Sequence, residues 1–215
     1  MTIRPVFSVE EKIPFYKTNN VSFKWTNGYS KPQKQKNIQA MHSAYLSQNP
    51  KKKVLEISSK SLQELGTKLS AFFLMKYVPS LERQVSVECV FQAGKVFEKG
   101  GPYLDILEKT SKDAKRDPRL RNSGKLIAFE FEGKRYPLDP KTIFYDYIYI
   151  NALLENPELS KMILDYDAFT DIEFNPERSI NCQAKAAAVF VSLSRQGLVD
   201  HIKNFDDFIK LYTSK

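Results

Sequence analysis

Short apolar runs at helical spacing, separated by prolines and glycines, constrain this chain more than any other feature of its sequence. Because apolar residues three or four positions apart fall on one face of a helix, these runs predict helices. Alternation of apolar and polar residues around Glu132-Gly133-Lys134 instead predicts a hairpin of two strands. The predicted helices are 34–48, 61–70, 86–98, 103–115, 142–154, 157–164, 184–194 and 205–212, and the predicted hairpin strands are 126–131 and 135–138.

The remaining segments complete a helix-rich α+β fold. The first 35 residues, interrupted by prolines and a glycine, are predicted to be irregular or short-stranded, and residues 53–59 are predicted to form a strand. Ser61 and Glu64 predict a capping box at the start of the helix 61–70. We therefore expect a single domain of the α+β class with a small antiparallel sheet.

Composition and cysteine usage argue against several classes of protein. Hydrophobic residues make up 42% of the chain and charged residues 27%, which is typical of a globular protein. No apolar stretch approaches the ~20 residues that span a bilayer, and the first residues lack the apolar core and cleavage site of a signal peptide. Cys89 and Cys182 are too few for a disulfide framework and do not form a CxxC motif. We expect a cytoplasmic protein with no membrane partner.

The net charge of +8 resides in residues 1–60, which hold eleven basic and three acidic side chains, whereas residues 61–215 hold 22 of each sign. This imbalance predicts a basic N-terminal segment, 1–60, attached to a catalytic domain, 61–215, and it favours a polyanionic partner. A solvated surface that serves solubility is the alternative. Aromatic residues among the lysines suit single-stranded nucleic acid. Core packing is the rival explanation and the one expected for most of them, which are Phe15, Tyr16, Phe23, Trp25 and Tyr29.

The segment VECVFQAGKVFEKGGPY, 87–103, is the most informative for chemistry. On a helix Glu88, Gln92 and Lys95 share one face, as a narrow polar stripe among apolar neighbours. A partly desolvated carboxylate and amine have mutually dependent pKa values. Such a carboxylate can act as general acid or base at a glycosidic bond, and such an amine can stabilise phosphate or attack an anomeric carbon. An ordinary amphipathic helix with an internal Glu–Lys contact is the alternative.

The same segment resembles the signature of NADAR-domain proteins, whose central helix reads approximately (S/T)-E-x-x-F-Q-A-x-K-F, where this chain has S-V-E-C-V-F-Q-A-G-K-V-F. Three further segments resemble the family in the same order, and the resemblance spans roughly 62–195: LGTKLSAFF (65–73), NPELSKMILDYDAFTD (156–171) and ERSINCQAKAAAVF (177–190). The whole chain resembles more specifically the NADAR antitoxins that accompany DarT-type toxins. Those toxins ADP-ribosylate guanine bases in single-stranded DNA, and the antitoxins reverse the modification.

The resemblance implies roles for matching positions. Glu88 is the implied catalytic carboxylate. Lys95 is the implied second active-site residue, either a nucleophile that forms a transient Schiff-base-like adduct with the ribose or an electrostatic partner. Gln92 would hold ribose hydroxyls, and Ser70 and Phe72 would line the pocket.

Two departures from the family pattern affect the implied pocket. Asp167 matches the family's acidic position, but the family's Trp-Gly is Thr170-Asp171 here, so Phe169 is left to supply any stacking surface. Ala71 replaces the family's asparagine, which puts one polar ligand contact in doubt.

Other motifs add one candidate and remove several. In the basic segment 115–125, Arg116 and Arg119 could bind the pyrophosphate of ADP-ribose or the DNA backbone, and a charged surface loop is the alternative. The acidic run 165–173 does not fit a calcium-binding loop, and His42 and His201 are far from any metal-ligating cluster in sequence. We expect no metal and no cofactor, with ADP-ribose as a substrate moiety and product.

Three hypotheses follow for the function. The first is a metal-independent ADP-ribosyl glycohydrolase that cleaves the N-glycosidic bond between ADP-ribose and guanine in DNA. The second is an N-glycosidase of a small riboflavin-pathway intermediate, for which the basic segment would have no use. The third is a non-catalytic antitoxin that binds DNA or sequesters the toxin. The expected partners are ADP-ribosylated single-stranded DNA, ADP-ribose and the cognate DarT-type toxin.

Overall fold

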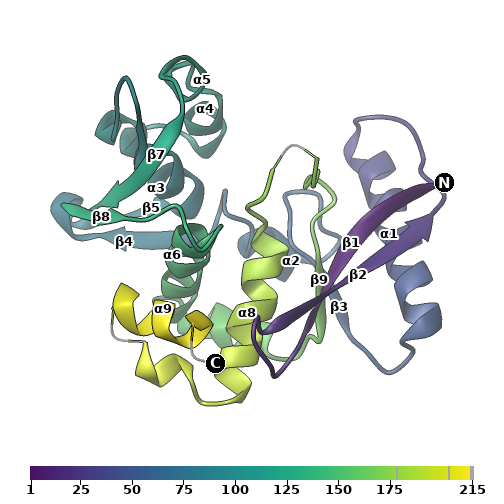
Figure 1. Cartoon of the computed structure of the whole chain (residues 1–215). Helices are drawn as coiled ribbons and strands as arrows, with labels where there is room; N and C mark the ends of the chain where they lie inside the picture. Colours follow the sequence, from purple (N-terminus) through teal and green to yellow (C-terminus); the bar gives the residue numbers. More distant parts are fainter. Residues whose placement is uncertain (178, 203, 214–215) are drawn as a thin grey trace. The chain divides into compact units, whose positions relative to one another are not determined.

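The computed structural model describes residues 1–177, 179–202 and 204–213, and the chain divides into two compact units. Unit 1 combines residues 1–70 with 158–215, and unit 2 is the continuous stretch 71–157 (Figure 1). The basic segment 1–60 therefore belongs to the same unit as the C-terminal part of the chain. The boundaries between the two units fall after residues 70 and 157, whereas the boundary predicted from the sequence falls after residue 60.

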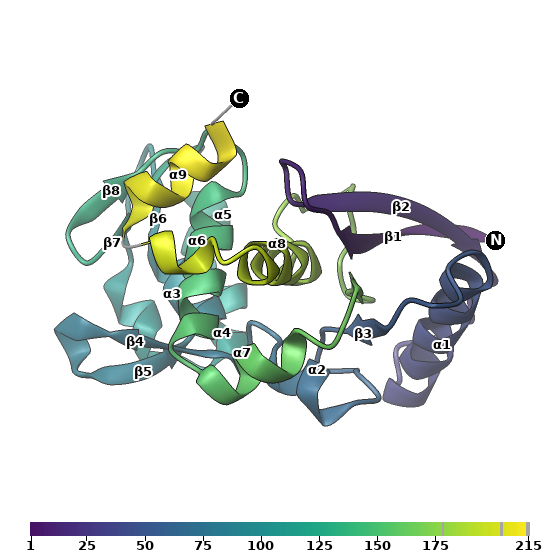
Figure 2. The same cartoon turned by 90° about the horizontal axis from the view of Figure 1, so that it is seen from below.

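Unit 1 is built on a mixed four-stranded sheet of order β2-β1-β9-β3. Strands β1 (Thr2–Val9) and β2 (Tyr16–Phe23) pair antiparallel along their whole length, and both views show them side by side (Figures 1 and 2). The short strand β9 (Ala168–Thr170) pairs antiparallel with β1 and parallel with β3 (Val54–Glu56). Strands from three distant parts of the sequence thus form one sheet.

Helices complete unit 1. Helix α1 (Lys31–Gln48) packs on β2, and helix α8 (Gln183–Arg195), nearly all of whose residues are buried, contacts β1, β2 and β9. Apolar side chains from the sheet and from α1 form a shared core: Val6, Val21, Phe23, Ile38, Met41, Tyr45, Val54, Ala168 and Ile172. The other elements of this unit are α2 (Glu64–Lys68), α7 (Pro157–Ile163), the 3₁₀ turn η3 (Val199–His201) and α9 (Phe205–Thr213).

Unit 2 surrounds the short helix α3 (Val87–Ala93), every residue of which is buried. Hairpin β4 (Met75–Val78) and β5 (Arg83–Ser86) leads into α3, and helix α6 (Ile143–Leu154) packs against it. A second, three-stranded sheet has the order β6-β7-β8. The remaining elements are η1 (Pro79–Leu81), β6 (Lys95–Phe97), η2 (Leu104–Glu108), α4 (Ser111–Arg116), α5 (Arg119–Asn122), β7 (Leu126–Phe131) and β8 (Lys134–Tyr136).

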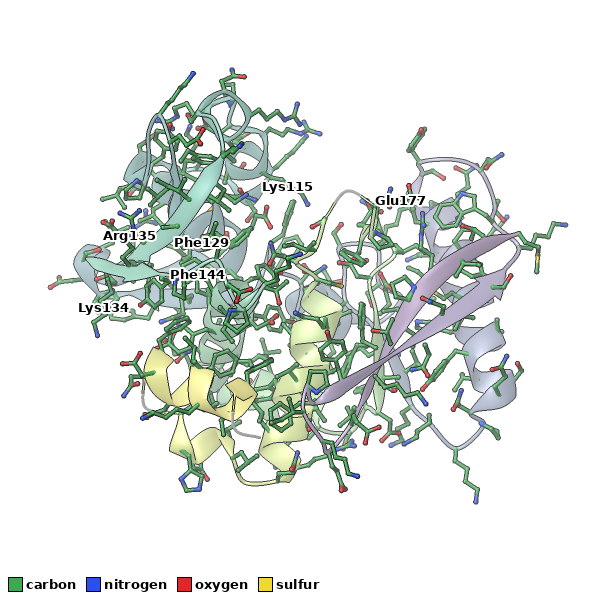
Figure 3. All side chains as sticks on the ribbon, viewed as in Figure 1. Lys115, Phe129, Lys134, Arg135, Phe144 and Glu177 are labelled. Carbon is green, nitrogen blue, oxygen red and sulfur yellow. The ribbon has the colours of Figure 1, made fainter. Side chains whose placement is uncertain are left out.

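Aromatic rings fill the space between α3, α6 and this second sheet. Phe129 of β7 stacks on Phe144 of α6 with ring centroids 4.5 Å apart, as Figure 3 shows. Phe91 of α3 meets Tyr145 edge to face at 5.0 Å. Such pairs bury large apolar areas with defined geometry, so α3 is held rigidly against its neighbours.

The α+β class is confirmed, as are the helices predicted over 34–48, 142–154, 157–164, 184–194 and 205–212 and the hairpin of β7 and β8. The first 23 residues were predicted to be irregular or short-stranded, and they form a hairpin of two eight-residue strands. Pro5 suggested a break, but β9 pairs with β1 only at Phe7 and Ser8. Pro5 therefore lies where β1 is an edge strand, a position that tolerates proline.

Four other predictions were wrong in detail. The helix 86–98 ends at Ala93, and the helix 103–115 is divided into η2 and α4, because the Thr110 side chain caps α4 by accepting from the Asp113 N–H. The predicted strand 53–59 is only three residues long. Helix α2 is capped at Gln63 without a side-chain bond, so the capping box is absent, and the Ser61 hydroxyl accepts from the Gln63 N–H instead.

Candidate active site

Helix α3 positions the candidate carboxylate at its first turn. Ser86 is the N-cap, and its hydroxyl accepts from the Cys89 N–H at 3.3 Å. Glu88 follows two residues later with 6% of its surface exposed, and its N–H donates to the Ala71 carbonyl at 2.9 Å. A carboxylate in the first turn is favoured by the helix dipole. The helix therefore offsets part of the cost of burying this acid.

Gln92 lies one turn after Glu88 and contacts it directly. The Gln92 Nε2 donates a 2.9 Å hydrogen bond to Glu88 Oε1. The other end of the amide, Gln92 Oε1, is buried and has no hydrogen-bond partner among the described residues. Buried carbonyl oxygens are seldom left without a donor, so this atom is an acceptor available to a hydroxyl or amine of a ligand.

Lys95 lies on β6 rather than on the helix that carries Glu88, which corrects the expectation of a shared helical face. Gly94 separates the two elements, and its carbonyl accepts from the Glu130 N–H of β7 at 2.7 Å. A Cβ at Gly94 would lie 2.7 Å from the Glu130 carbonyl oxygen. The close approach of β7 therefore requires glycine at this position, where helix α3 ends and strand β6 begins.

The Lys95 amine remains electrostatically coupled to Glu88. Burial lowers the pKa of Lys95 to about 8, the negative charge of Glu88 opposes that shift, and the positive charge of Lys115 adds to it. The Lys95 Nζ lies 4.7 Å from the centroid of the Phe91 ring. An amine with this pKa is uncharged in an appreciable fraction of molecules near neutral pH, so it can act as a nucleophile as well as a cation.

Phe72 and Lys115 lie near this group. The Lys115 Nζ is 5.4 Å from the centroid of the Phe72 ring, and the Phe72 carbonyl accepts from the Ser111 hydroxyl at 2.9 Å. Lys115 is exposed, and Figure 3 shows it at the opposite end of unit 2 from Lys134. Sequence reasoning had placed Lys115 only within a basic segment, without a link to Lys95.

The two arginines expected to bind phosphate differ in their surroundings. Arg116 is exposed. Arg119 pairs with Asp117 at 2.7 Å and with Asp105 at 2.6 Å, and its guanidinium lies 4.4 Å from the centroid of the Tyr103 ring. These contacts occupy the guanidinium of Arg119 and give it a structural role. Phosphate binding by either arginine stays a prediction.

The other three predicted residues lie in unit 1. The Ser70 hydroxyl donates to the Thr67 carbonyl at 2.9 Å. Asp167 accepts from the Lys53 N–H at 2.9 Å and pairs with Arg195 at 3.2 Å. Phe169 is fully buried at the centre of the sheet, so this placement does not support its predicted stacking on a ligand. The first two roles stay predictions.

A buried polar chain in unit 1 was missed from the sequence. The Thr170 hydroxyl donates to Glu56 Oε2 at 2.5 Å and lies 2.8 Å from His42 Nε2. Burial raises the pKa of Glu56 and lowers that of His42 to about 4. Nothing in the spacing of residues 42, 56 and 170 signals this contact, because the pairing of β3 with β9 places Glu56 beside Thr170 and His42 comes from helix α1.

Neither a metal centre nor a membrane segment is found in the described ranges. In those ranges no three His, Cys, Asp or Glu side chains are grouped so as to hold a metal ion. No helix there is both long enough and apolar enough to cross a membrane.

Comparison with known families places the chain. Residues 2–215 match the family described as DarT1-associated NADAR antitoxin. The chain belongs to this family. No curated protein matches it. Membership in the NADAR antitoxins supports an antitoxin role and associates the chain with a toxin of the DarT type. The segment of the chain that resembles the family before α8 includes Arg178, which lies outside the described residues.

Proposed function

We propose that this NADAR antitoxin is an ADP-ribosyl glycohydrolase that removes ADP-ribose from guanine bases in single-stranded DNA and so reverses a DarT-type toxin. The observation that carries the proposal is the group formed by Glu88, Gln92 and Lys95. It contains a buried carboxylate, an amide oxygen that awaits a donor, and an amine with a pKa of about 8. These are the groups that cleavage of a ribosyl C–N bond requires.

In the proposed reaction the neutral Lys95 amine attacks the anomeric carbon of the ribose. The bond between that carbon and the guanine nitrogen breaks, and its electron pair stays on the nitrogen. The Glu88 carboxylate takes a proton from the attached Lys95 nitrogen and passes it to the guanine nitrogen. Water then displaces Lys95, and Glu88 carries a proton from the water to the departing lysine amine. The net reaction consumes one water and yields ADP-ribose and unmodified guanine. No oxidant or reductant is needed for this balance.

Gln92 serves two purposes in this scheme. Its Nε2 orients the Glu88 carboxyl group, and its Oε1 accepts a hydrogen bond from a ribose hydroxyl of the substrate. The second contact would satisfy the buried acceptor only when the ligand is bound, which favours a hydroxyl-rich substrate over an apolar one. Lys115 is the cation whose charge adds to the lowering of the Lys95 pKa, and because it is exposed it is available for a phosphate.

The experiment that tests the proposal follows release of ADP-ribose from an ADP-ribosylated guanine oligonucleotide by the purified chain, with EDTA present. Glu88→Gln keeps the shape of the side chain and its contact with Gln92, and Lys95→Ala removes the amine. We expect both variants to lose at least about 100-fold in rate. Lys134→Ala, in an exposed position of unit 2, is the matched control and should retain full activity.

Two outcomes would contradict the proposal. Wild-type protein that releases no ADP-ribose, yet protects cells from the toxin, would indicate a sequestering antitoxin. Release from a small N-glycoside but not from the oligonucleotide would favour a metabolite as the substrate.

A further inference from the structure

The segment that joins β2 to α1, residues 24–30, is held in place at several points. The buried Asn37 side chain accepts from the Thr26 N–H at 2.7 Å and donates to the Thr26 carbonyl at 2.9 Å. Ser30 caps α1 through a capping box with Gln33. The side chain of Gln33 also covers Gly28, where φ is 129° and a Cβ would lie 2.0 Å from Gln33 Oε1. The backbone of this segment is therefore fixed rather than free.

Tyr29 extends from this fixed backbone with 95% of its surface exposed. The other aromatic residues of the N-terminal segment differ. Phe15 and Phe23 are buried, which confirms core packing for them. Trp25 is half-buried, with Arg4 5.4 Å and Lys34 5.6 Å from its ring centroid. Core packing therefore does not account for Tyr29. An exposed ring on an ordered loop loses little entropy when a flat ligand stacks on it.

The charges next to Tyr29 are positive. Lys24 and Lys31 are exposed on either side of it, and neither forms an ion pair with another described residue. Lys34 differs, because it pairs with Glu173 at 3.3 Å. The sequence contains no acidic residue between Glu11 and Glu56. The segment lies at the end of the hairpin where β1 begins and β2 ends (Figure 1).

We propose that the segment 24–31 binds single-stranded nucleic acid, with a base stacked on Tyr29 and neighbouring phosphates on Lys24 and Lys31. An aromatic face between cations is the arrangement that holds an unpaired strand. A duplex would hide the base faces, and a protein partner would need an apolar patch, whereas the exposed neighbours Thr26, Asn27 and Ser30 are polar. The inference rests on the proposed function for the source of the strand, since the substrate there is a modified DNA strand.

Binding of an unmodified, fluorescently labelled single-stranded DNA oligonucleotide to the full chain tests this proposal without requiring catalysis. Tyr29→Ala should weaken binding roughly 10-fold, because it removes one base–aromatic stack. Tyr29→Phe should keep the affinity, since the ring remains. Tyr77→Ala, which removes a tyrosine 43% exposed on β4, is the matched control and should bind like wild type.

The salt dependence of the same binding tests the lysines. Lys24→Gln and Lys31→Gln should each reduce the slope of log affinity against log salt by about 0.7, and Lys134→Gln should leave it unchanged. Equal affinity for duplex and single strand, or unchanged binding by Tyr29→Ala, would overturn the proposal. So would loss of binding to the toxin by Tyr29→Ala with oligonucleotide binding intact, which would assign the surface to a protein.

The two proposals can fail separately. If the chain releases no ADP-ribose but Tyr29→Ala weakens binding to the unmodified strand, the glycohydrolase proposal fails and the strand-binding surface stands. If ADP-ribose is released from the modified oligonucleotide at the same rate and KM by wild type and Tyr29→Ala, and binding is also unchanged, the surface proposal fails alone.

Discussion

Gln92 Nε2 donates a 2.9 Å hydrogen bond to Glu88 Oε1, while Gln92 Oε1 stays buried without a partner among the described residues. The amide nitrogen is therefore satisfied within the protein, whereas the amide oxygen is not. The Gln92 oxygen is already removed from water in the folded protein. A ligand hydroxyl that donates to it therefore forms a hydrogen bond without the cost of desolvating this oxygen.

Gln92→Met should remove both the contact with Glu88 and the acceptor for the ligand. Methionine keeps the volume but neither orients Glu88 nor accepts from a ligand, so kcat/KM on the modified oligonucleotide should fall roughly 10- to 100-fold. The free energy of unfolding should change by no more than about 1 kcal/mol, because one hydrogen bond and one unsatisfied acceptor disappear together. Steady-state kinetics and urea unfolding measure the two. An unchanged KM and kcat would exclude Gln92 from the site.

The rate of ADP-ribose release should rise with pH up to about 8 and then level. Lys95 has a pKa of about 8, so its neutral fraction increases about tenfold per pH unit below that value. The glycosylamine that Lys95 forms with the ribose can open its sugar ring to an imine, which borohydride reduces to a stable secondary amine. Borohydride added during turnover should therefore leave a covalent adduct on Lys95, detected by mass spectrometry, and Lys95→Arg should give neither adduct nor activity. A rate that falls through pH 8, with no trapped adduct, would assign Lys95 the role of a cation instead.

Stability should depend on pH through the same lysine. The folded-state pKa of about 8 lies below the ordinary value of 10.5, so the unfolded chain holds more protons between these two values. The contribution of Lys95 to the free energy of unfolding therefore rises from pH 8 to pH 10.5. Lys95→Met should remove this rise and stabilise the protein at pH 7 by no more than about 3 kcal/mol. Lys134→Met should keep the wild-type profile in urea unfolding at each pH.

Arg119→Ala should lower stability without changing substrate affinity. The change leaves Asp117, a carboxylate with 4% of its surface exposed, with Lys109 as its remaining charged partner at 2.6 Å. We expect a loss of about 1 to 3 kcal/mol in the free energy of unfolding with KM unaltered. Arg116→Ala, next to it on an exposed position, should leave stability unchanged. A raised KM with unchanged stability in Arg119→Ala would restore its predicted phosphate-binding role.

Sequence reasoning recovered the helices with a long and unambiguous period, and also the shorter helices α7 and α9. Helices α1, α6 and α8 extend over 12 residues or more, and the Glu132–Gly133 turn marks the β7–β8 hairpin. Val96 and Phe97 were predicted as the end of a helix but lie on strand β6, because two buried apolar residues fit a helix as well as a strand. The helix ends before this pair because β7 approaches closely at Gly94. This long-range contact cannot be predicted from the local sequence pattern.

The candidate site divides in the same way. Glu88 and Gln92 lie on one face of α3 because of their spacing of four, as predicted, and the structure adds a hydrogen bond between them. Two other contacts join residues that are distant in the sequence, so no periodicity predicts them. They are the electrostatic coupling of Lys95 to Lys115 and the hydrogen-bonded group of His42 and Thr170.

Strand β9 determines when the sheet of unit 1 can form during synthesis of the chain. Its residues, 168–170, pair between β1 and β3, so the sheet of unit 1 cannot close until the ribosome has made more than three quarters of the chain. All of 71–157, with Glu88, Gln92 and Lys95, has been synthesised by then. The nascent chain thus carries the residues proposed for chemistry before it can complete the sheet whose hairpin leads into Tyr29. A message cut short before residue 168 would supply these residues and Tyr29, but not the strand that completes the sheet.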